Sequence, residues 1–533
     1  MRRIVFHPFL LAVAPILYLF VHNARRFALN PNELLLPIGL ALVSTGLLLL
    51  IFALLLRNWA KAGIVVSWAV LLFFVYGHIF SALRLARARP GAFPLLLILL
   101  ELLVLWLVIR ARGNLSGLTT FMNAAATMVV LINLVTGLTG TALRNTLYAT
   151  RSSHSLGHSV RPAVLSPRSP DIYYIILDTY IRSDYLKADY GTDNSGFLSY
   201  LTQNGFYVAI RARSNYAQTH LSLASSLNMT YLDSVVAEQG AESQDVTPLI
   251  RMIETSRVAE FLKAHGYRVV TYVSGYTGTE LKDADVHLAP RLRFSEFSDV
   301  LLEATILPRL LGSWTGALRD ELHRQTILYT LRTIPRAARG KQPSFVFAHV
   351  LCPHTPFVFD SFGNRPHITP YERVSETGTN QVVSRQQLQR WYQANYGPQV
   401  IYLSRLVQAA VKQILADASR PAIIVVQGDH GAGSIMTENA DDPAQLPRRH
   451  AILDAIHLPG TDRLPLTAKH PEVDSGLRQA AGLYDSISPV NTFRVILNQY
   501  FDTSVALLPD RRYFSLLGRP YRLQLVTAPD RVP

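Results

Sequence analysis

Five long apolar runs fill the first 140 residues of this chain and constrain its fold more than any other feature. They cover residues 4–21, 34–56, 62–83, 93–109 and 117–138, each close to the roughly 20 residues that a helix needs to cross a bilayer. We therefore predict a bundle of about five transmembrane helices over residues 1–140. Since further runs follow the first and no obvious small-residue cleavage site separates them, we interpret the first as a retained helix and not as a removed signal peptide.

The positive charge of the chain lies mostly in the joints between these runs. Residues 1–150 contain 12 Lys and Arg against only Glu33 and Glu101, which leaves +4 of the net charge of +14 for residues 151–533. Basic joints orient membrane helices and contact anionic head groups. The charge therefore gives no support for nucleic-acid binding, and we expect membrane lipids as partners. Counted by side, the basic residues barely favour one orientation, so the odd number of helices carries the expectation of an extracytoplasmic C-terminal domain.

Two ionisable residues fall inside the apolar runs, Glu101 in the fourth and His78 in the third. An ionisable group at that depth is costly and is a candidate for function. The alternative, which we favour, is a polar contact between helices, either Glu101 with His78 or Glu101 with Asn123 or Asn133 of the fifth run.

The rest of the chain has the pattern of a water-soluble α/β domain. Residues 141–170 are rich in Ser, Arg, Pro and His and are predicted to form a linker. From residue 171 to 533, short β-rich runs alternate with helical stretches, which predicts a mostly parallel sheet covered on both faces. The predicted strands are 172–177, 267–273, 344–350 and 422–426, and helical spacing covers 255–265 and 400–416. The single cysteine, Cys352, excludes an intramolecular disulfide, so the core must hold this domain together.

The strongest local signal is the sequence Gly-Asp-His-Gly at 428–431, which ends an apolar strand. Ligands bind beyond the carboxyl ends of parallel strands, and here Asp429 and His430 stand at that edge between glycines that permit a close approach. A carboxylate and an imidazole together suit a divalent metal. Asp and Gly are also ordinary turn residues, so the weight of the motif depends on its partners.

Two candidate partners come from other segments. Asp178 ends the predicted strand 172–177 in the same way, although alone it would more often cap a helix. Thr219 falls near the N-terminus of a predicted helix, where free backbone N–H groups and the helix dipole favour an alkoxide or a bound phosphate. The alternative for Thr219 is a simple cap.

A third partner is the loop after strand 344–350, which contains His349 and the run Pro353-His354-Thr355-Pro356. The prolines fix the loop and hold a histidine at the sheet edge. We select His349 and His354 as candidate catalytic residues, since an imidazole there could contact a non-bridging oxygen or protonate a leaving group. Either could instead be a structural loop residue, and Cys352 is expected to be packed and not nucleophilic.

The order of these motifs resembles that of sulfatase-like enzymes of the alkaline phosphatase superfamily. With the preceding membrane helices, the layout looks like lipoteichoic acid synthases and, more distantly, lipid A phosphoethanolamine transferases. The resemblance implies an alkaline-phosphatase-like α/β/α sandwich over residues 171–533, one divalent metal bound by Asp178, Asp429 and His430, and Thr219 as both nucleophile and metal ligand. It implies that His354 contacts the substrate. It also implies that residues 448–460 form the strand after the Asp-His motif.

Two departures from the family pattern shape the expected chemistry. Sulfatases that use formylglycine need Cys or Ser in a Cys/Ser-x-Pro-x-Arg setting, and this chain has Thr-His-Leu-Ser-Leu at 219–223. Asp178 stands where the transferases commonly have Glu, which shortens the ligand. The mixed oxygen and nitrogen ligands favour Mn²⁺ or Zn²⁺ over Mg²⁺ or Ca²⁺. We expect a phosphoester hydrolase or transferase acting on a phospholipid head group or envelope glycan, with a sulfuric or phosphoric ester hydrolase or an inactive glycan-binding protein as alternatives.

Overall fold

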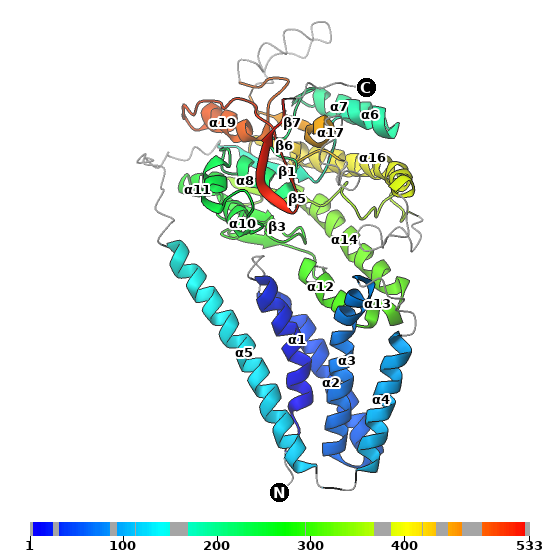
Figure 1. Cartoon of the computed structure of the whole chain (residues 1–533). Coiled ribbons are helices and arrows are strands. Elements are labelled where there is room, and N and C mark those ends of the chain that lie inside the picture. Colours follow the sequence, from blue (N-terminus) through cyan, green and yellow to red (C-terminus); the bar gives the residue numbers. More distant parts are fainter. Residues whose placement is uncertain are drawn as a thin grey trace. The chain divides into compact units, whose positions relative to one another are not determined.

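The computed structural model describes residues 4–24, 31–85, 93–111, 113, 115–149, 169–293, 295–366, 385–417, 419–432, 446–460 and 482–527. The chain forms two compact units, each considered by itself (Figure 1). The first, called the membrane unit, contains Met1–Ser159 and Phe294–Ala317. The second contains Val160–Arg293 and Leu318–Pro533, and is called the catalytic unit because it holds the residues that the sequence marks as candidates for catalysis. Most of the predicted linker, residues 150–168, lies outside the described residues.

Each predicted apolar run forms a helix of the membrane unit. The helices are α1 (His7–Ala24), α2 (Leu35–Leu56, preceded by the 3-10 turn η1, Pro31–Leu34), α3 (Trp59–Leu85), α4 (Phe93–Arg110) and α5 (Ser116–Ala149). Within the described residues, the spans Pro31–Leu56, Trp59–Phe80 and Ser116–Thr139 are long and apolar enough to cross a membrane, and α1 is a shorter apolar helix. The prediction of an N-terminal membrane bundle is confirmed, with three to five crossings.

The expected contact between Glu101 and an asparagine is absent from the described residues. Asn123 accepts hydrogen bonds from the first residues of α1, including the N–H of His7 at 3.0 Å. Asn133 donates to the carbonyl of Val129 in its own helix. The interpretation of a Glu–Asn pair is therefore wrong here, because the N–H groups at the start of α1 have no partner within that helix and take the amide of Asn123.

A segment from the second half of the sequence packs with the membrane helices. It contains α12 (Glu296–Ala304), α13 (Leu307–Leu310) and the first residues of α14 (Ser313–Thr333). Ser295 caps α12 by accepting the N–H of Ser298. Phe297 and Leu301 on this helix are buried in one cluster with residues of α1, α2 and α3. The sequence pattern did not predict that part of residues 171–533 belongs to the membrane unit.

The catalytic unit is built on a seven-stranded sheet with the order β2-β7-β6-β1-β5-β3-β4. The strands are β1 (Asp171–Leu177), β2 (Phe206–Val208), β3 (Arg268–Tyr272), β4 (Val286–Leu288), β5 (Ser344–Val350), β6 (Ala422–Gly428) and β7 (Asp454–His457). β7 is antiparallel to β6 and β2, and the other neighbours are parallel. All four predicted strands are present, and β7 lies within the segment that the family resemblance assigned to a strand. A separate hairpin joins β8 (Tyr513–Leu516) and β9 (Arg519–Leu525).

Helices cover both faces of this sheet. Alternate residues of β1 point to opposite faces, so that Ile175 and Leu177 join one buried cluster and Tyr174 and Ile176 the other. The first cluster includes residues of α6 (Ser183–Tyr190), α7 (Ser195–Gln203), α14 and α16 (Arg385–Asp417). The second includes residues of α8 (Thr219–Ser226), α10 (Thr247–Glu254), α11 (Arg257–Ala264) and α19 (Pro489–Tyr500). The remaining described helices of this unit are α9 (Asp233–Gln239), η3 (Ile334–Arg336) and α17 (Leu446–His450). The predicted α/β/α sandwich is confirmed.

Candidate metal and catalytic site

The site lies at the carboxyl ends of the three central strands. β1 pairs in parallel with β5 on one side and with β6 on the other, and its last residue, Leu177, is opposite Val350 and Gly428. The residues that follow these strands therefore emerge at one edge of the sheet. This register brings Asp178 and Asp429 together although 250 residues separate them in the sequence.

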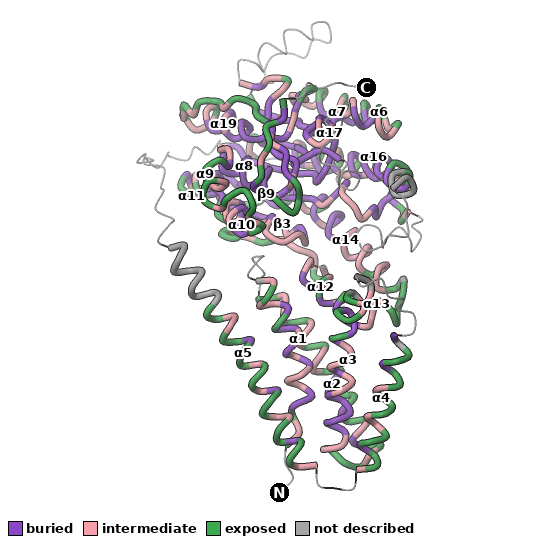
Figure 2. The backbone as a smooth tube through the Cα atoms, in the orientation of Figure 1, coloured by how far each residue is buried: buried purple, intermediate pink, exposed green. Residues whose placement is uncertain are grey.

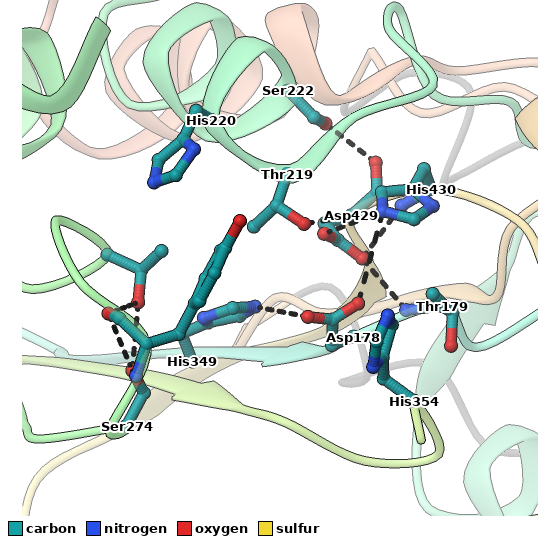
Figure 3. A network of polar contacts seen from close by, with 12 residues as sticks. Asp178, Thr179, Thr219, His220, Ser222, Ser274, His349, His354, Asp429 and His430 are labelled. Carbon is teal, nitrogen blue, oxygen red and sulfur yellow. Dashed lines mark hydrogen bonds and ion pairs between the residues drawn. The ribbon is translucent and has the colours of Figure 1, made fainter. Parts of the chain in front are cut away.

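Four predicted site residues meet at this edge (Figure 3). His430 Nε2 lies 3.9 Å from Asp178 Oδ1 and 3.6 Å from Asp429 Oδ2. Thr219 Oγ1 lies 3.3 Å from the same nitrogen. Ligand atoms of Asp178, Asp429 and His430 all fall within 4.8 Å of one another. A single small ion could contact all of them.

The glycines on either side of Asp429 and His430 are needed because the backbone passes very close to other segments. A Cβ on Gly428 would lie 2.6 Å from the carbonyl oxygen of Tyr180, and one on Gly431 would lie 1.9 Å from that of Arg448. Any side chain at either position would force the Asp-His turn away from its place at the sheet edge.

Helix α8 positions Thr219 as its first residue, as its sequence predicts. Gln218 before it is extended and starts the helix. One turn later, the Ser222 hydroxyl donates to the carbonyl of Asp429 at 2.6 Å and ties the helix to the Asp-His turn. Thr219 is 9% exposed, so its hydroxyl lies in a site largely closed to water.

Asp429 is oriented by two backbone donors. Its Oδ1 accepts the N–H of Thr179 at 2.9 Å and the N–H of His430 at 2.8 Å. Thr179 has a φ of +63°, a conformation rare for residues with a side chain. Because these bonds occupy Oδ1, the other oxygen, Oδ2, is left to face His430.

Asp178 is surrounded by histidines. His349 Nε2 approaches its Oδ2 at 3.4 Å from β5, and His349 is only 1% exposed. Burial opposes ionisation of Asp178, but the nearby His354, His349 and His430 outweigh it and hold its pKa below the usual range. His349 is therefore positioned to orient the Asp178 carboxylate.

His354 lies on the loop after β5 and is only half-buried, whereas the other predicted site residues are buried. Its backbone N–H donates to the Asp178 carbonyl at 3.1 Å. Gln399 on α16 holds the loop in place by donating to the carbonyls of Pro353 and His354 and accepting the N–H of Val358. Sequence reasoning missed Gln399, since a glutamine inside a long helix carries no signal of its own.

Two further histidines lie near the site and were not predicted. His220 Nε2 is 2.9 Å from the Thr277 carbonyl, and its ring stacks on Tyr276 beside Thr219. His323 of α14 is close enough to His354 that the two interact electrostatically, and burial lowers the pKa of His323 to about 4. His220 follows Thr219 directly in the sequence and could have been selected on that basis, whereas nothing marks His323.

Cys352 is buried, and burial raises the pKa of its thiol well above the usual range. The expectation that it is packed is confirmed, and a thiol with a raised pKa is a poor nucleophile at neutral pH.

The residues present fit a divalent metal. Asp178 Oδ1 and Asp429 Oδ2 are both buried, and neither has a hydrogen-bond partner in the described part of the chain. Buried carboxylate oxygens without partners are costly unless a cation neutralises them. Both oxygens face the same imidazole nitrogen, which is the arrangement that a bound cation would stabilise.

Comparison with solved structures finds matches of low similarity. Two of them are the zinc complex of the periplasmic domain of EcEptC from Escherichia coli and the integral membrane lipooligosaccharide phosphoethanolamine transferase A from Neisseria meningitidis. The first has a TM-score of 0.41 and 12% identity and covers 68% of this chain and 94% of its own. The second has a TM-score of 0.38 and 13% identity and covers 92% and 95%.

Sequence comparison identifies the family. A search of curated proteins found no match. The family model named Sulfatase, however, matches residues 170–458, which is more than half of the chain and contains every predicted site residue. As the resemblance of its motifs indicated, the chain belongs to the sulfatase family.

Proposed function

We propose that this protein is a metal-dependent phosphoester hydrolase or phosphotransferase in which Thr219 is the nucleophile. The observation that carries the proposal is the position of the Thr219 hydroxyl, 3.3 Å from His430 Nε2 at the start of α8, beside two buried carboxylate oxygens without partners. A hydroxyl at such a place is poised to lose its proton and attack an electrophile.

Asp178, Asp429, His430 and Thr219 would hold one divalent ion, with Mn²⁺ or Zn²⁺ favoured by the ligand set. When bound, the ion would lower the pKa of the Thr219 hydroxyl and offset charge on the transferred phosphoryl group. His349 would act as a positioning residue for Asp178, since it contacts that carboxylate from the buried side.

The reaction would take place in two steps. First, the bond from Thr219 Oγ1 to phosphorus forms while the bond to the leaving oxygen breaks, and the hydroxyl proton passes to solvent. His354, the most exposed of the predicted site residues, would protonate the leaving oxygen. Then water or an acceptor hydroxyl attacks the phosphothreonine, releases Thr219 Oγ1 and gives up its own proton.

The phosphoester preference follows from the residues around Thr219. Formylglycine-dependent sulfate hydrolysis needs a Cys or Ser that can be converted to the aldehyde hydrate, and threonine at 219 cannot supply it. The membrane unit favours a substrate that is itself in the membrane or envelope, such as a phospholipid head group or a glycan. We expect the catalytic unit on the extracytoplasmic side, because an odd number of crossings puts the two ends of the chain on opposite sides of the membrane.

Turnover by the purified full-length protein tests the proposal. Wild type, Thr219→Ala and Thr219→Ser would be compared on aryl phosphate, bis-aryl phosphate, aryl sulfate and phospholipid donors, with Mn²⁺ or Zn²⁺ added. We expect metal-dependent cleavage of a phosphoester that Thr219→Ala abolishes and Thr219→Ser, which keeps a hydroxyl, partly retains. Unchanged activity of Thr219→Ala would rule out the nucleophile, and metal binding without turnover of any donor would favour a binding role.

A further inference from the structure

The segment 295–317 carries a second surface that the catalytic function does not explain. On one side it packs against membrane helices, and on the other it exposes large apolar side chains. Leu310 is 67% exposed, Leu311 is 49% exposed and Trp314 is 79% exposed. These three residues are called the apolar ledge.

The packed side of the segment contacts one end of the bundle. Phe297 meets Phe20 of α1 edge to face, with ring centroids 5.4 Å apart. Ser295 donates to Glu33, just before α2. Ile306 packs against the cluster that joins α3 to the start of α4. Because neighbouring helices alternate in direction, these positions all belong to the same end of the bundle (Figure 1).

The segment also reaches below the end of the apolar span of α3. The N–H of Ile306 donates to the carbonyl of Phe73 at 3.2 Å. Phe73 lies inside the span Trp59–Phe80 and seven residues before its end, which corresponds to about 10 Å of helix. The turn between α12 and α13 therefore lies alongside the apolar span of α3, about two helical turns from its end.

The backbone at this turn is satisfied by protein groups, as hydrocarbon requires. Besides the bond to Phe73, the N–H of Leu307 donates to the hydroxyl of Thr305 at 3.2 Å. Arg309 places its guanidinium 4.0 Å from the ring centroid of Phe80 at the end of the span. Basic side chains and tryptophan are the residues that mark the boundary between hydrocarbon and water.

We propose that the apolar ledge is a phospholipid-binding surface that inserts α13 and the start of α14 into the membrane at this end of the bundle. The argument for lipid as the occupant is continuity: the ledge follows directly on a turn that packs alongside the apolar span of α3, and the outer faces of these helices are themselves apolar. The acidic residues of α12, Glu296, Asp299 and Glu303, give no reason to require an anionic lipid. The expected contact is with acyl chains and the head-group boundary of a neutral phospholipid.

Spin labelling of the full-length protein in nanodiscs of dioleoylphosphatidylcholine tests this. A nitroxide would be attached to Leu310→Cys, with Leu131→Cys on α5 as a lipid-facing reference and Ser195→Cys of the catalytic unit as a water-facing reference. Cys352 can stay, since it is buried and its thiol pKa is raised, and the unsubstituted protein measures background labelling.

We expect the label at 310 to be accessible to oxygen and about fivefold less accessible to a water-soluble nickel chelate than the label at 195. Access to the chelate equal to that at 195 would show a ledge in water and overturn the proposal. Low access to both reagents would show a ledge covered by protein, and would overturn it equally. None of these readings depends on enzymatic activity, so they separate this inference from the proposed function.

Two glycines provide a matched pair of variants. A Cβ on Gly77 of α3 would lie 2.1 Å from the carbonyl oxygen of Glu303, whereas one on Gly39 of α2 meets nothing within 4 Å. Gly77→Leu should push α12 off the bundle and raise chelate access at 310, and Gly39→Leu should leave it unchanged. An equal response to both substitutions would contradict the packed position of the segment.

Discussion

The two units place the same kinds of side chain in opposite environments. In the membrane unit, Leu40 is 59% exposed and Phe121 is 69% exposed, and such residues run along the outside of the helices (Figure 2). In the catalytic unit, Phe345 and Phe347 are completely buried in the sheet. The difference reflects the solvent, because an apolar exterior is stable in lipid and costly in water. Exposed apolar side chains therefore distinguish the membrane helices from the sheet of the catalytic unit.

The segment 295–317 shows that position in the sequence does not decide which solvent a helix meets. It lies between β4 and β5 of the catalytic sheet, yet it buries Phe297 against membrane helices and exposes Trp314. Its amphipathic pattern alone is compatible with an ordinary surface helix, and only its packing identifies its environment.

Buried carboxylates give the sharpest contrast between the units and the largest expected effect. Glu101, Asp178 and Asp429 each have a buried oxygen without a partner among the described residues, but only the last two share a site with His430. We expect Asp429→Asn to lose the metal and to lower kcat/KM by about 10⁴-fold. Glu101→Gln, the matched control, should change neither metal content nor turnover. Elemental analysis and turnover of both variants measure this, and metal loss in Glu101→Gln would break the contrast.

Removing a phenylalanine ring should cost more stability in the core of the catalytic unit than on the outer surface of the membrane unit. Phe345 is fully buried and contacts Phe493 edge to face at 5.7 Å, so Phe345→Ala should lower the free energy of unfolding by about 3–5 kcal/mol. Phe121→Ala on the outside of α5 should cost less than about 1 kcal/mol, since lipid replaces the ring. Denaturant unfolding of both variants in the same detergent measures the difference. Equal losses would mean that the ring of Phe121 packs against protein.

Substitution of the two predicted catalytic histidines should have different effects, because the two side chains contact different groups. His354→Gln should lower kcat/KM by about 10²-fold without loss of metal, since His354 is placed to protonate the leaving group. His349→Gln should act through Asp178, weakening metal affinity by about 10-fold, with added metal restoring most of the turnover. Metal titrations of turnover distinguish the two. Rescue of the His354→Gln variant by added metal would contradict the role of His354 as a proton donor and would indicate that it supports the metal site.

Much of the fold follows from local sequence pattern. The apolar runs predict the membrane helices, and β-rich runs predict β1, β3, β5 and β6 within one or two residues, because buried parallel strands are continuously apolar. β2 and β4 have only three residues each and leave no detectable pattern. The packing of 295–317 depends on contacts across more than 200 residues of sequence, which periodicity does not record.

The candidate site is predictable to a similar extent. Asp178, Thr219, Asp429 and His430 each follow a strand or begin a helix, and those positions converge whenever the strands are parallel neighbours. The contact between His349 and Asp178 could not be predicted in this way. It depends on which face of β5 the histidine occupies and on the register of β5 with β1. Gln399 and His323 act from long helices and could be found only from the structure.

The smallest expected effect compares two equally buried carboxyls of the catalytic unit, Asp454 and Asp178. Histidines lower the pKa of Asp178, whereas burial raises that of Asp454 to about 7, only partly opposed by a hydrogen bond from Gln427 at 2.8 Å. The folded protein thus keeps a proton on Asp454 that the unfolded chain loses near pH 4. Stability should therefore fall as the pH rises from about 4 to about 7, and stay level with respect to this group above that.

Asp454→Asn mimics the neutral acid and removes this dependence. The variant can still accept the Gln427 hydrogen bond, and it lacks the loss of stability that wild type undergoes above about pH 4. It should therefore already be more stable than wild type at pH 5, and more stable by a further amount of about 1–2 kcal/mol at pH 8, where wild type carries a buried charge. Unfolding of both proteins at the two pH values measures the difference. An equal difference in stability between the two proteins at pH 5 and pH 8 would mean that Asp454 does not change its charge over this range. Burial would then not raise the pKa of Asp454 above that of Asp178 as expected.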